Sequence, residues 1–439
     1  MKLADRKIIE KLQSMTPILW VNPCLMSTKK VLPELPFSFS CILDAQARTY
    51  RFAPLIMELF EDTRDSGGLI ESELVEVPSM TEFLRKKHHL PSIKPFYVKA
   101  DHNLPVAGSV KARGGVYEVL QFAEKLAIAN GLLKTEDNYE CLRNADVRKL
   151  FSRYTISVGS TGNLGYSVGR MGAALGFSVV VHMSKDAKEW KKERLRHYGV
   201  KVIEHDADYT TAVRCAREQS SASGNSYFVD DEDSSHLFLG YAAAAIRLQH
   251  QLKSAGIKVD QGNPLFVYLP CGIGGAPGGI TFGLKHILGD HVHCFFAEPP
   301  GSPCMLLGLM SGRHSQIKVY DIGLDNKTEA DGLAVSSPSH FVGQTIKNLI
   351  SGVYTFQESD MFEYIRAAGQ YEAMKLEPSA TAGFAGPDHI LNSAAGKEYL
   401  KKHKLLNNWN AITHLIWTTG GRFVPEKEYN EFCLKHLPA

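Results

Sequence analysis

A glycine-rich stretch after an apolar run is the part of this chain best suited to bind a small anion. The uncharged run 264–270 leads into Cys271, and five of the next eight residues are glycine, namely Gly272, Gly274, Gly275, Gly278 and Gly279. Glycines let successive backbone N–H groups converge on one anion, and a following helix N-terminus adds a positive dipole end. The stretch therefore predicts a buried strand, a phosphate-binding loop and the start of a helix.

Two nucleotide-binding motifs do not fit this loop. A Walker loop needs a lysine directly after its glycines, whereas Gly279 is followed by Ile280 and Thr281. The dinucleotide pattern G-x-G-x-x-G, started at Gly272, would place Pro277 at its last glycine. Either the loop is a purely structural turn, or it holds a phosphate by backbone amides alone. The second reading suits a cofactor that is anchored covalently elsewhere.

Lys111 is the candidate for that covalent anchor. It follows a predicted strand (95–100) and loop (101–108), and Ser109 is placed to cap a helix whose apolar residues recur from 116 to 123. A helix N-terminus disfavours a cation, so the amine is pushed towards the neutral form that a Schiff-base lysine needs. The alternative is a lysine that only extends into solvent.

Two further polar loops follow predicted strands. Ser160-Thr161-Gly162-Asn163 follows the strand 154–158, and Thr418-Thr419-Gly420-Gly421 follows the strand 412–417. Open parallel sheets bind ligands beyond the carboxyl ends of their strands, so these loops, Lys111 and the glycine loop are predicted to share one site. Taken singly, the first loop is explained by a helix cap and the second by a strand exit.

Strands and helices alternate regularly around the first of these loops. Strands are predicted at 154–158, 177–183, 200–204 and 226–229, with helices at 164–175, 187–198 and 209–218 between them. This order is typical of right-handed βαβ units and a parallel sheet. Further on, we expect helices at 235–252, 343–350, 360–375 and 386–404, and strands at 265–270, 293–297 and 412–417.

Length and composition limit the class of protein. The chain has 439 residues, 44% of them hydrophobic, and about 150 residues per domain gives two or three domains. Its 49 Lys and Arg nearly balance its 47 Asp and Glu, so charge predicts neither a nucleic-acid nor a membrane partner. The eight cysteines lack metal-ligand spacing, the N-terminus lacks the apolar core of a signal peptide, and no apolar run approaches the ~18 residues that span a bilayer. We therefore expect a cytoplasmic protein.

Several of these segments together resemble a known enzyme family. The runs Ser109–Gly115 and Gly159–Gly165, with the lysine-free glycine loop, are similar to those of the fold-type II pyridoxal-phosphate enzymes. The match extends from about Asp44 to the C-terminus. Three longer runs narrow the resemblance to the D-serine dehydratase (D-serine ammonia-lyase) family: Pro270–Gly279, Ala330–Val335 and Leu376–Ala380.

The resemblance implies an α/β fold with two open parallel-sheet α/β domains and pyridoxal 5'-phosphate in the cleft between them. Residues 1–150 would be an N-terminal segment and the first part of a large cofactor-binding domain, which carries Lys111. Residues 151–233 would be a small α/β domain with the asparagine loop. Residues 234–439 would complete the large domain with the glycine loop and the Thr-Thr-Gly-Gly segment.

The resemblance also implies roles for single residues. Lys111 would hold the cofactor covalently, Asn163 would bond the 3′ oxygen of its ring, and Thr419 would face its pyridine nitrogen. The substrate carboxylate would be bound by Ser160, Thr161 and Gly162, and catalysis would depend on Lys111, Thr161 and Asp231. The cofactor phosphate would be bound by Gly272, Gly274, Gly275, Gly278 and Gly279.

The implied reaction is the loss of the β-hydroxyl of D-serine, which yields pyruvate and ammonia. An acid is needed near the leaving hydroxyl, and either the cofactor phosphate or Asp231 supplies it. The alternative is that Asp230 and Asp231 only cap the helix that begins near Ser235. A monovalent cation, potassium, is expected near Glu298, with an ion pair as the alternative. The expected partners are the small-molecule substrate D-serine and at most a second copy of the chain, as a monomer or homodimer.

Two departures from the family pattern leave alternatives open. Ala276 occupies a glycine position of the phosphate loop, where a Cβ clashes if φ is positive. The run Ser336–His340 lacks the glycine and arginine of the family version, and nothing in the spacing encodes substrate stereochemistry. The alternatives are a fold-type II β-eliminase acting on L-serine, L-threonine or D-cysteine, and a non-catalytic pyridoxal-phosphate-binding homologue.

Overall fold

The computed structural model describes residues 3–160, 162–185, 187–206 and 209–435. They form two compact units, each of which combines separate stretches of the chain. Unit 1 contains residues up to 38, residues 72–103 and residues from 245 onward, and unit 2 contains residues 39–71 and 104–244. Each unit has a largely or wholly parallel sheet of its own, so the predicted α/β fold class is confirmed.

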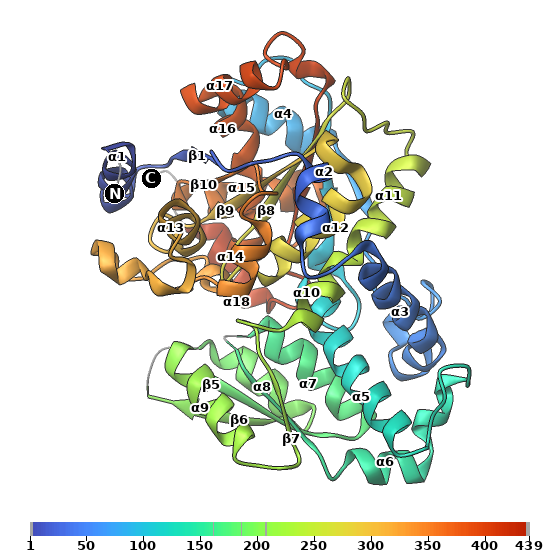
Figure 1. Ribbon diagram of the computed structural model, residues 1–439. Coiled ribbons are helices and arrows are strands. Elements are labelled where there is room, and N and C mark those ends of the chain that lie inside the picture. Colours follow the sequence, from blue (N-terminus) through green and yellow to red (C-terminus); the bar gives the residue numbers. More distant parts are fainter. Residues whose placement is uncertain (1–2, 161, 186, 207–208, 436–439) are drawn as a thin grey trace. The chain divides into compact units, whose positions relative to one another are not determined.

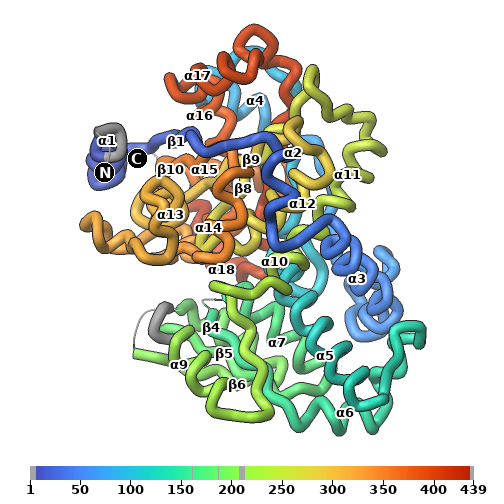
Figure 2. Tube along the Cα trace, viewed as in Figure 1, coloured from blue at the N-terminus to red at the C-terminus, as the bar shows by residue number. Residues whose placement is uncertain are grey.

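Unit 2 is built on a four-stranded parallel sheet in the order β6-β5-β4-β7. In chain order its elements are β4 (Thr155–Gly159), α7 (Asn163–Leu175), β5 (Ser178–Ser184), α8 (Glu189–His197), β6 (Lys201–His205), α9 (Tyr209–Ser221) and β7 (Ser226–Val229). Helix α7 packs on β4 and β5, and α9 packs against all four strands. Figure 2 shows α9 beside β5 and β6. The predicted alternation of strands and helices is therefore confirmed, with every bound within three residues of its expected place.

Unit 2 has four further α-helices among its described residues, one of which follows Lys111 closely in the chain. These helices are α3 (Phe39–Leu59), α5 (Tyr117–Ala129), α6 (Ala145–Phe151) and α10 (Ser235–Ala242). Helix α3 packs against α5 and α10, and its apolar residues Ile42, Phe52 and Ile56 are buried at helical spacing. A π-helical turn (Ala112–Val116) precedes α5, directly after Lys111. Such turns occur frequently at functional sites.

The two compact units are divided differently from the predicted domains. Residues 151–233 are only part of unit 2, which also contains Lys111, a residue expected in the large domain. The reason is the close packing of α7 on the π-helical turn, because a Cβ added at Gly115 would lie 2.9 Å from Ser167 Cβ and 3.0 Å from Leu164 Cδ1. The expected helix 235–252 is also divided into α10 and α11 (Ala244–Ser254), and the chain passes from unit 2 to unit 1 between them.

Unit 1 is built on a seven-stranded sheet in the order β1-β10-β9-β8-β11-β3-β2. Figure 1 labels β1, β10, β9 and β8 of this sheet. Its strands are β1 (Leu19–Val21), β2 (Leu74–Val77), β3 (Phe96–Lys99), β8 (Leu265–Pro270), β9 (Val292–Glu298), β10 (Gly352–Thr355) and β11 (Thr413–Trp417). The five inner strands are parallel, whereas the edge strands β1 and β2 are antiparallel to their neighbours. Every residue of β8, β9 and β11 is buried, which explains their mostly apolar sequences.

The helices of unit 1 pack around this sheet. In addition to α11 they are α1 (Leu3–Gln13), α2 (Thr28–Val31), α4 (Pro78–Lys87), α12 (Gly275–Leu288), α13 (Cys304–Ser311), α14 (His340–Ile346), α15 (Glu358–Glu372), α16 (Gly386–Asn392), α17 (Ala394–Lys402) and α18 (Glu426–Leu434). Helix α12 packs on β9 and α14, and a 3₁₀ segment (Pro378–Ala385) packs on β8, β9 and β11. Among the helices of the described residues, none combines the length and apolarity that a membrane-spanning segment requires.

Candidate active site

The glycine loop joins β8 to α12 in unit 1, as the sequence predicts. Strand β8 ends at Pro270 and α12 begins at Gly275. Gly274 has φ +109°, and a Cβ there would collide with Met305 Cε, so only glycine suits this position. The first turn of α12 is buried, and the first N–H groups of a helix have no acceptor within it. This end of α12 is therefore suited to bind an anion.

Ala276 does not disturb the loop. It lies in the first turn of α12 and is not one of the residues with positive φ. The clash that would follow from a positive φ therefore does not arise, and its methyl group is compatible with the helix start.

The run 336–340, which departs from the family pattern, supports the glycine loop. Ser339 donates its N–H to Ile273 O at 2.9 Å, and its Oγ accepts from Val342 N at 3.1 Å at the start of α14. Nearby, Leu333 Cα lies 3.2 Å from the place where a Cβ on Gly272 would be. The departure thus affects residues that position the glycine loop.

Two more of the sequence motifs meet in the same unit. Gly332 donates its N–H to Ser379 Oγ at 3.0 Å. Glu377 donates its N–H to Gly420 O at 3.1 Å, which ties the run Leu376–Ala380 to the segment after β11. Motifs that are far apart in the sequence thus surround the glycine loop and Thr419 in unit 1.

The two threonines after β11 have different partners. Thr418 Oγ1 donates to Lys99 O at 2.9 Å and lies 2.8 Å from His102 Nδ1. Because that hydroxyl has only one proton, His102 Nδ1 is the donor in the second bond. Burial lowers the pKa of His102 to about 4, so the ring is neutral. Thr419 Oγ1 is buried and has no hydrogen-bond partner among the described residues.

In unit 2, Lys111 lies beside Asp231. Lys111 Nζ is 3.1 Å from Asp231 Oδ2 and 3.3 Å from its Oδ1. The Lys111 side chain is 20% exposed and that of Asp231 is 9% exposed, so the pair is reachable but largely shielded from water. The N–H of Lys111 donates to Ser109 Oγ at 3.3 Å, which is the capping contact expected of Ser109. The amine of Lys111 and the carboxylate of Asp231 are thus close enough to exchange a proton.

The alternative role of Asp230 and Asp231 as helix caps is wrong. The N-cap of α10 is Ser234, whose Oγ accepts from Leu237 N at 3.1 Å. Asp230 instead forms an ion pair with Arg217 on α9. Asp231 is thus left to face Lys111.

The asparagine loop follows β4 and begins α7. Ser160 Oγ accepts from Gly162 N at 3.0 Å and from Gly165 N at 2.9 Å, so this side chain does cap the helix. The hydroxyl proton of Ser160 is not used in either bond. Asn163 is the first residue of α7. Thr161 lies outside the described residues.

Glu298 ends β9 and caps the next helix of unit 1. Its Oε1 accepts from Met305 N at 2.7 Å and its Oε2 accepts from Leu306 N at 2.8 Å, at the start of α13. Full burial raises the pKa of Glu298 to about 8. The described residues contain no group of three or more His, Cys, Asp or Glu side chains placed to hold a metal ion. The expected ion pair at Glu298 is replaced by two backbone hydrogen bonds.

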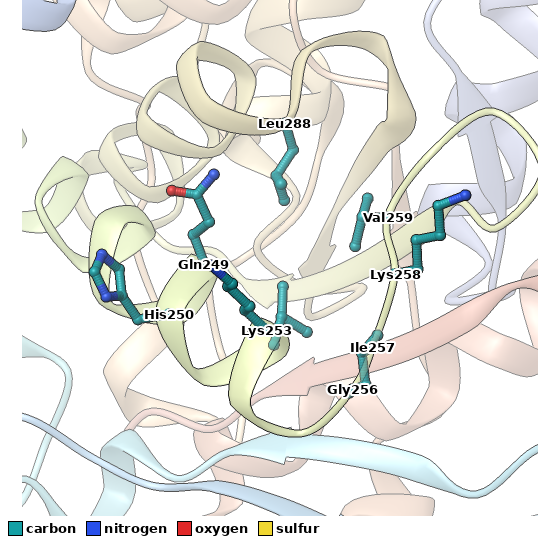
Figure 3. A pocket seen from close by; sticks show the side chains of 9 residues that line it. Gln249, His250, Lys253, Gly256, Ile257, Lys258, Val259 and Leu288 are labelled. Atoms are coloured by element: carbon teal, nitrogen blue, oxygen red, sulfur yellow. The ribbon is translucent and has the colours of Figure 1, made fainter.

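Unit 1 also has a surface pocket of about 590 Å³, on the segment that leads into β8 (Figure 3). It is lined by residues of α11, of the following loop and of the end of α12, among them His250, Lys253, Ile257 and Leu288. Ligands of parallel sheets bind at the carboxyl ends of the strands, whereas this pocket precedes β8. None of the predicted site residues lines it.

Comparison with known proteins identifies the family. Residues 71–400 match the family model described as "Pyridoxal-phosphate dependent enzyme". The chain belongs to this family. The chain is 48% identical over 434 residues to a "Probable D-serine dehydratase" of Bacillus cereus, a match that covers 99% of this chain and 97% of the relative. It is 50% identical over 409 residues to a "Probable D-serine dehydratase" of Geobacillus kaustophilus, covering 93% of each.

Solved structures confirm the fold of this pyridoxal-phosphate-dependent enzyme. Diaminopropionate ammonia lyase from Escherichia coli superposes with a TM-score of 0.73 at 18% identity and covers 96% of this chain and 97% of that one. Serine racemase from Dictyostelium discoideum superposes with a TM-score of 0.59 at 18% identity, covering 88% of this chain and 98% of that one. The predicted fold-type II architecture is therefore confirmed.

The site residues fit pyridoxal phosphate. The orphaned hydroxyl of Thr419 suits a ring nitrogen, because a hydroxyl can either donate or accept a hydrogen bond. The loop before α12 suits a phosphate, and the partly exposed amine of Lys111 is available for a covalent bond.

Two functional neighbours of Asp231 were missed by the sequence analysis. They are Arg217 on α9, which pairs with Asp230 and Glu232 on either side of Asp231, and Glu118 on α5, which accepts from Tyr227 before the acidic run and from Ser234 and Leu237 after it. A signal for Glu118 was present, because it is an acid within the apolar helix segment 116–123, and such an acid needs buried partners. Arg217 gave no signal, since a cation on a surface helix is normally solvated.

Proposed function

We propose that the chain is a D-serine ammonia-lyase, a carbon–nitrogen lyase that converts D-serine to pyruvate and ammonia in the catabolism of D-amino acids. The observation that carries this proposal is the Lys111–Asp231 pair, 3.1 Å apart. β-Elimination needs one group that removes the α-proton and another that protonates the leaving hydroxyl. The relatives named "Probable D-serine dehydratase", 48–50% identical over almost the whole chain, support the choice of substrate.

The proposed catalytic pair makes two proton transfers with the substrate. Lys111 first passes a proton to Asp231, and its neutral amine then removes the proton from the α-carbon of the substrate. Asp231 gives a proton to the β-hydroxyl, which leaves as water, and Thr161 completes the catalytic set proposed from the sequence. When bound, the cofactor supplies an electron sink for the α-carbon.

The remaining residues hold the cofactor and the substrate in place. The loop Ser160–Gly162 binds the substrate carboxylate, with the spare proton of Ser160 as one donor. Asn163 bonds the 3′ oxygen of the ring, and Thr419 bonds the pyridine nitrogen. Because a hydroxyl brings no full negative charge to that nitrogen, Thr419 favours elimination over transamination. The phosphate is bound by backbone groups of Gly272, Gly274, Gly275, Gly278 and Gly279.

Steady-state assays with D-serine, L-serine, L-threonine and D-cysteine test this function. We expect kcat/KM for D-serine to exceed that for L-serine at least ~10-fold, which needs only about 1.4 kcal/mol of differential transition-state binding. Oxo acid and ammonia are both measured, so that elimination is distinguished from transamination. A preference for an L-amino acid would overturn the substrate, and bound cofactor without oxo acid from any of the four would indicate a non-catalytic homologue.

We infer that Glu298 acts as a helix cap rather than as a ligand for the expected potassium ion. Both carboxyl oxygens already accept N–H bonds, and a helix N-terminus repels a cation. Initial rates in potassium, sodium and Tris buffers of equal ionic strength should therefore agree. Activation by potassium alone would restore the cation prediction.

The location and assembly of the enzyme remain predictions from the sequence. All eight cysteines are free thiols, which supports a reducing, cytoplasmic environment. We propose a monomer or a homodimer. Sedimentation equilibrium of the cofactor-loaded protein distinguishes these states, and a larger assembly would contradict both.

A further inference from the structure

Four acidic residues follow β7 in a row, yet only one of them faces Lys111. Asp231 contacts the amine of Lys111, while Asp230 and Glu232 contact the guanidinium of Arg217. The fourth acid, Asp233, is exposed. Neighbouring carboxylates of this loop therefore bind different partners.

Arg217 binds the two acids on either side of Asp231, which are Asp230 and Glu232. Its Nε donates to Asp230 Oδ2 at 2.9 Å. Its Nη2 donates to Asp230 Oδ1 at 2.9 Å and to Glu232 Oε2 at 2.7 Å. The bidentate bond fixes the orientation as well as the charge of Asp230. These hydrogen bonds raise the pKa of Arg217 above its ordinary value.

Asp230 in turn shapes the backbone on either side of Asp231. Its Oδ1 accepts from Glu232 N at 3.1 Å, and its backbone oxygen accepts from Ser234 N at 2.9 Å. The side chain of Asp231 projects from the middle of this turn. A residue that fixes Asp230 therefore also fixes the direction of Asp231.

Glu118 holds the inner side of the same loop. This buried carboxyl on α5 accepts from Tyr227 Oη at 2.8 Å, from Ser234 Oγ and from Leu237 N at 3.0 Å. Tyr227 lies before the acidic run and Ser234 after it, so both ends of the loop are fixed to one side chain. That side chain lies seven residues after Lys111, on the helix that continues from the π-helical turn.

We infer that Arg217 and Glu118 are positioning residues that direct Asp231, and no other acid of the loop, towards Lys111. The inference rests on the proposed function, in which Asp231 protonates the leaving hydroxyl. Without Arg217, Asp230 would lose the bidentate bond that fixes it and would compete with Asp231 for the amine of Lys111. Neither Arg217 nor Glu118 contacts Lys111 itself in the hydrogen bonds and ion pairs of the described residues.

The test compares two substrates with the same D-amino-acid skeleton, one whose leaving group needs a proton and one whose leaving group does not. D-Serine loses hydroxide, which must be protonated, whereas β-chloro-D-alanine loses chloride, which needs no proton. Both kcat and KM are measured on the cofactor-loaded enzyme for each substrate. A group that acts by directing Asp231 should affect the first substrate and spare the second.

For Arg217→Ala we expect kcat with D-serine to fall at least ~10-fold, within the range of a misplaced general acid, while kcat with β-chloro-D-alanine changes less than ~2-fold. Arg217→Lys should restore part of the loss, because lysine keeps the charge but not the bidentate geometry. The matched control is Arg214→Ala on the same helix, which removes only the exposed pair with Glu218 and should leave both substrates unchanged.

Asp231→Asn separates this inference from the proposed function. If kcat of that variant falls equally with both substrates, the role of Asp231 as the acid is wrong. Suppose instead that Asp231→Asn lowers kcat with D-serine only. If Arg217→Ala then lowers kcat equally with both substrates, or with neither, the positioning role of Arg217 is wrong. When Arg217→Ala is combined with Asp231→Asn, we expect kcat with D-serine to fall no further than in Asp231→Asn alone, because both changes disable the same acid.

Discussion

Thr418 and Thr419 are adjacent in the chain, but only the hydroxyl of Thr418 has partners in the protein. Thr418 Oγ1 bonds Lys99 O and His102 Nδ1, whereas Thr419 Oγ1 is buried without a partner among the described residues. A buried hydroxyl that stays unsatisfied costs about 1–3 kcal/mol. An incoming ring nitrogen that satisfies Thr419 would remove this cost, so the pair allows cofactor binding to be separated from stability.

For Thr419→Val we expect weaker binding of pyridoxal phosphate, by about 5- to 10-fold, because one hydrogen bond of about 1 kcal/mol is lost. The cofactor-free protein should be as stable as before or slightly more stable. Thr418→Val should do the reverse, with lower stability and a smaller effect on the cofactor. Fluorescence titration and urea unfolding of both variants check this, and equal behaviour of the two would contradict the assignment.

Lys111→Ala is expected to abolish covalent attachment of the cofactor. Without the amine no imine forms, so the visible absorbance of the lysine-linked cofactor should be absent and borohydride should fix nothing to the protein. Lys125→Ala, on the exposed side of α5, is the control and should behave as the wild type. A reducible adduct that persists in Lys111→Ala would place the attachment site at another lysine.

Single residues were predictable from the sequence when their type is unusual for its place. Lys111 at a helix start and the glycines around 274 met this condition, and the structure places both as expected. The contact between Lys111 and Asp231 was not predictable, since it joins the end of β7 to the start of a helix 120 residues earlier. Such pairs depend on sheet order, which local patterns do not encode.

Among the elements, the loop between β8 and α12 is the one most constrained by its backbone. For Gly274→Ala we expect a loss of stability of about 1–3 kcal/mol and weaker cofactor binding, because the φ of +109° strains an alanine backbone and Met305 must also move its end away from the new methyl group. Gly256→Ala is a matched control, since its φ of +70° causes similar strain with no atom within 4 Å. Only Gly274→Ala should weaken cofactor binding in a titration, and an equal effect of both would place the phosphate elsewhere.

The loop between β7 and α10 makes stability depend on pH through Glu118. Burial raises the pKa of Glu118 from 4.5 to about 7. A carboxyl with a raised pKa favours the folded state in its protonated form, so this stabilisation is complete below pH 4.5 and is lost as pH rises through 7. The difference between the two pKa values corresponds to about 3 kcal/mol.

Between pH 5 and pH 8 the free energy of unfolding of the wild type should therefore fall more than that of Glu118→Gln. The difference between the two falls should be up to about 3 kcal/mol. Glutamine keeps an acceptor oxygen for Tyr227, Ser234 and Leu237 but does not titrate. Urea unfolding at the two pH values measures the effect. The same pH dependence in both proteins would show that Glu118 is ionised in the folded state throughout this range.

Long or repeated elements were predicted from the sequence, and short edge elements were not. The strands and helices of unit 2 follow a regular period, and their bounds were anticipated closely. The edge strands β1 and β2 have three and four residues, and they are defined by their antiparallel pairing with β10 and β3 rather than by a pattern of their own. The division of α10 from α11 was also missed, because the apolar spacing continues across Ala243.

At the scale of the whole molecule, the two units are each assembled from separate stretches of the chain. Unit 2 needs residues 39–71 and 104–150 in addition to the βαβ run 151–233. Phe122 on α5 stacks on Tyr227 with ring centroids 4.2 Å apart, and Glu124 on the same helix pairs with Arg48 and Arg51 of α3. A boundary drawn from the strand–helix pattern alone therefore divides a single core.

This organisation predicts which fragment folds. Residues 151–233 alone should not unfold cooperatively, because Tyr227 and Leu164 would lose the apolar cover of α5 and the π-helical turn. Residues 39–71 joined by a Gly-Ser linker to 104–244 keep these contacts and the partners of Glu118 and Glu124, so this chain should show one cooperative transition. Thermal unfolding followed by far-UV circular dichroism compares the two. A cooperative transition in the short fragment would mean that the parallel sheet of unit 2 is stable without the helices that carry Lys111.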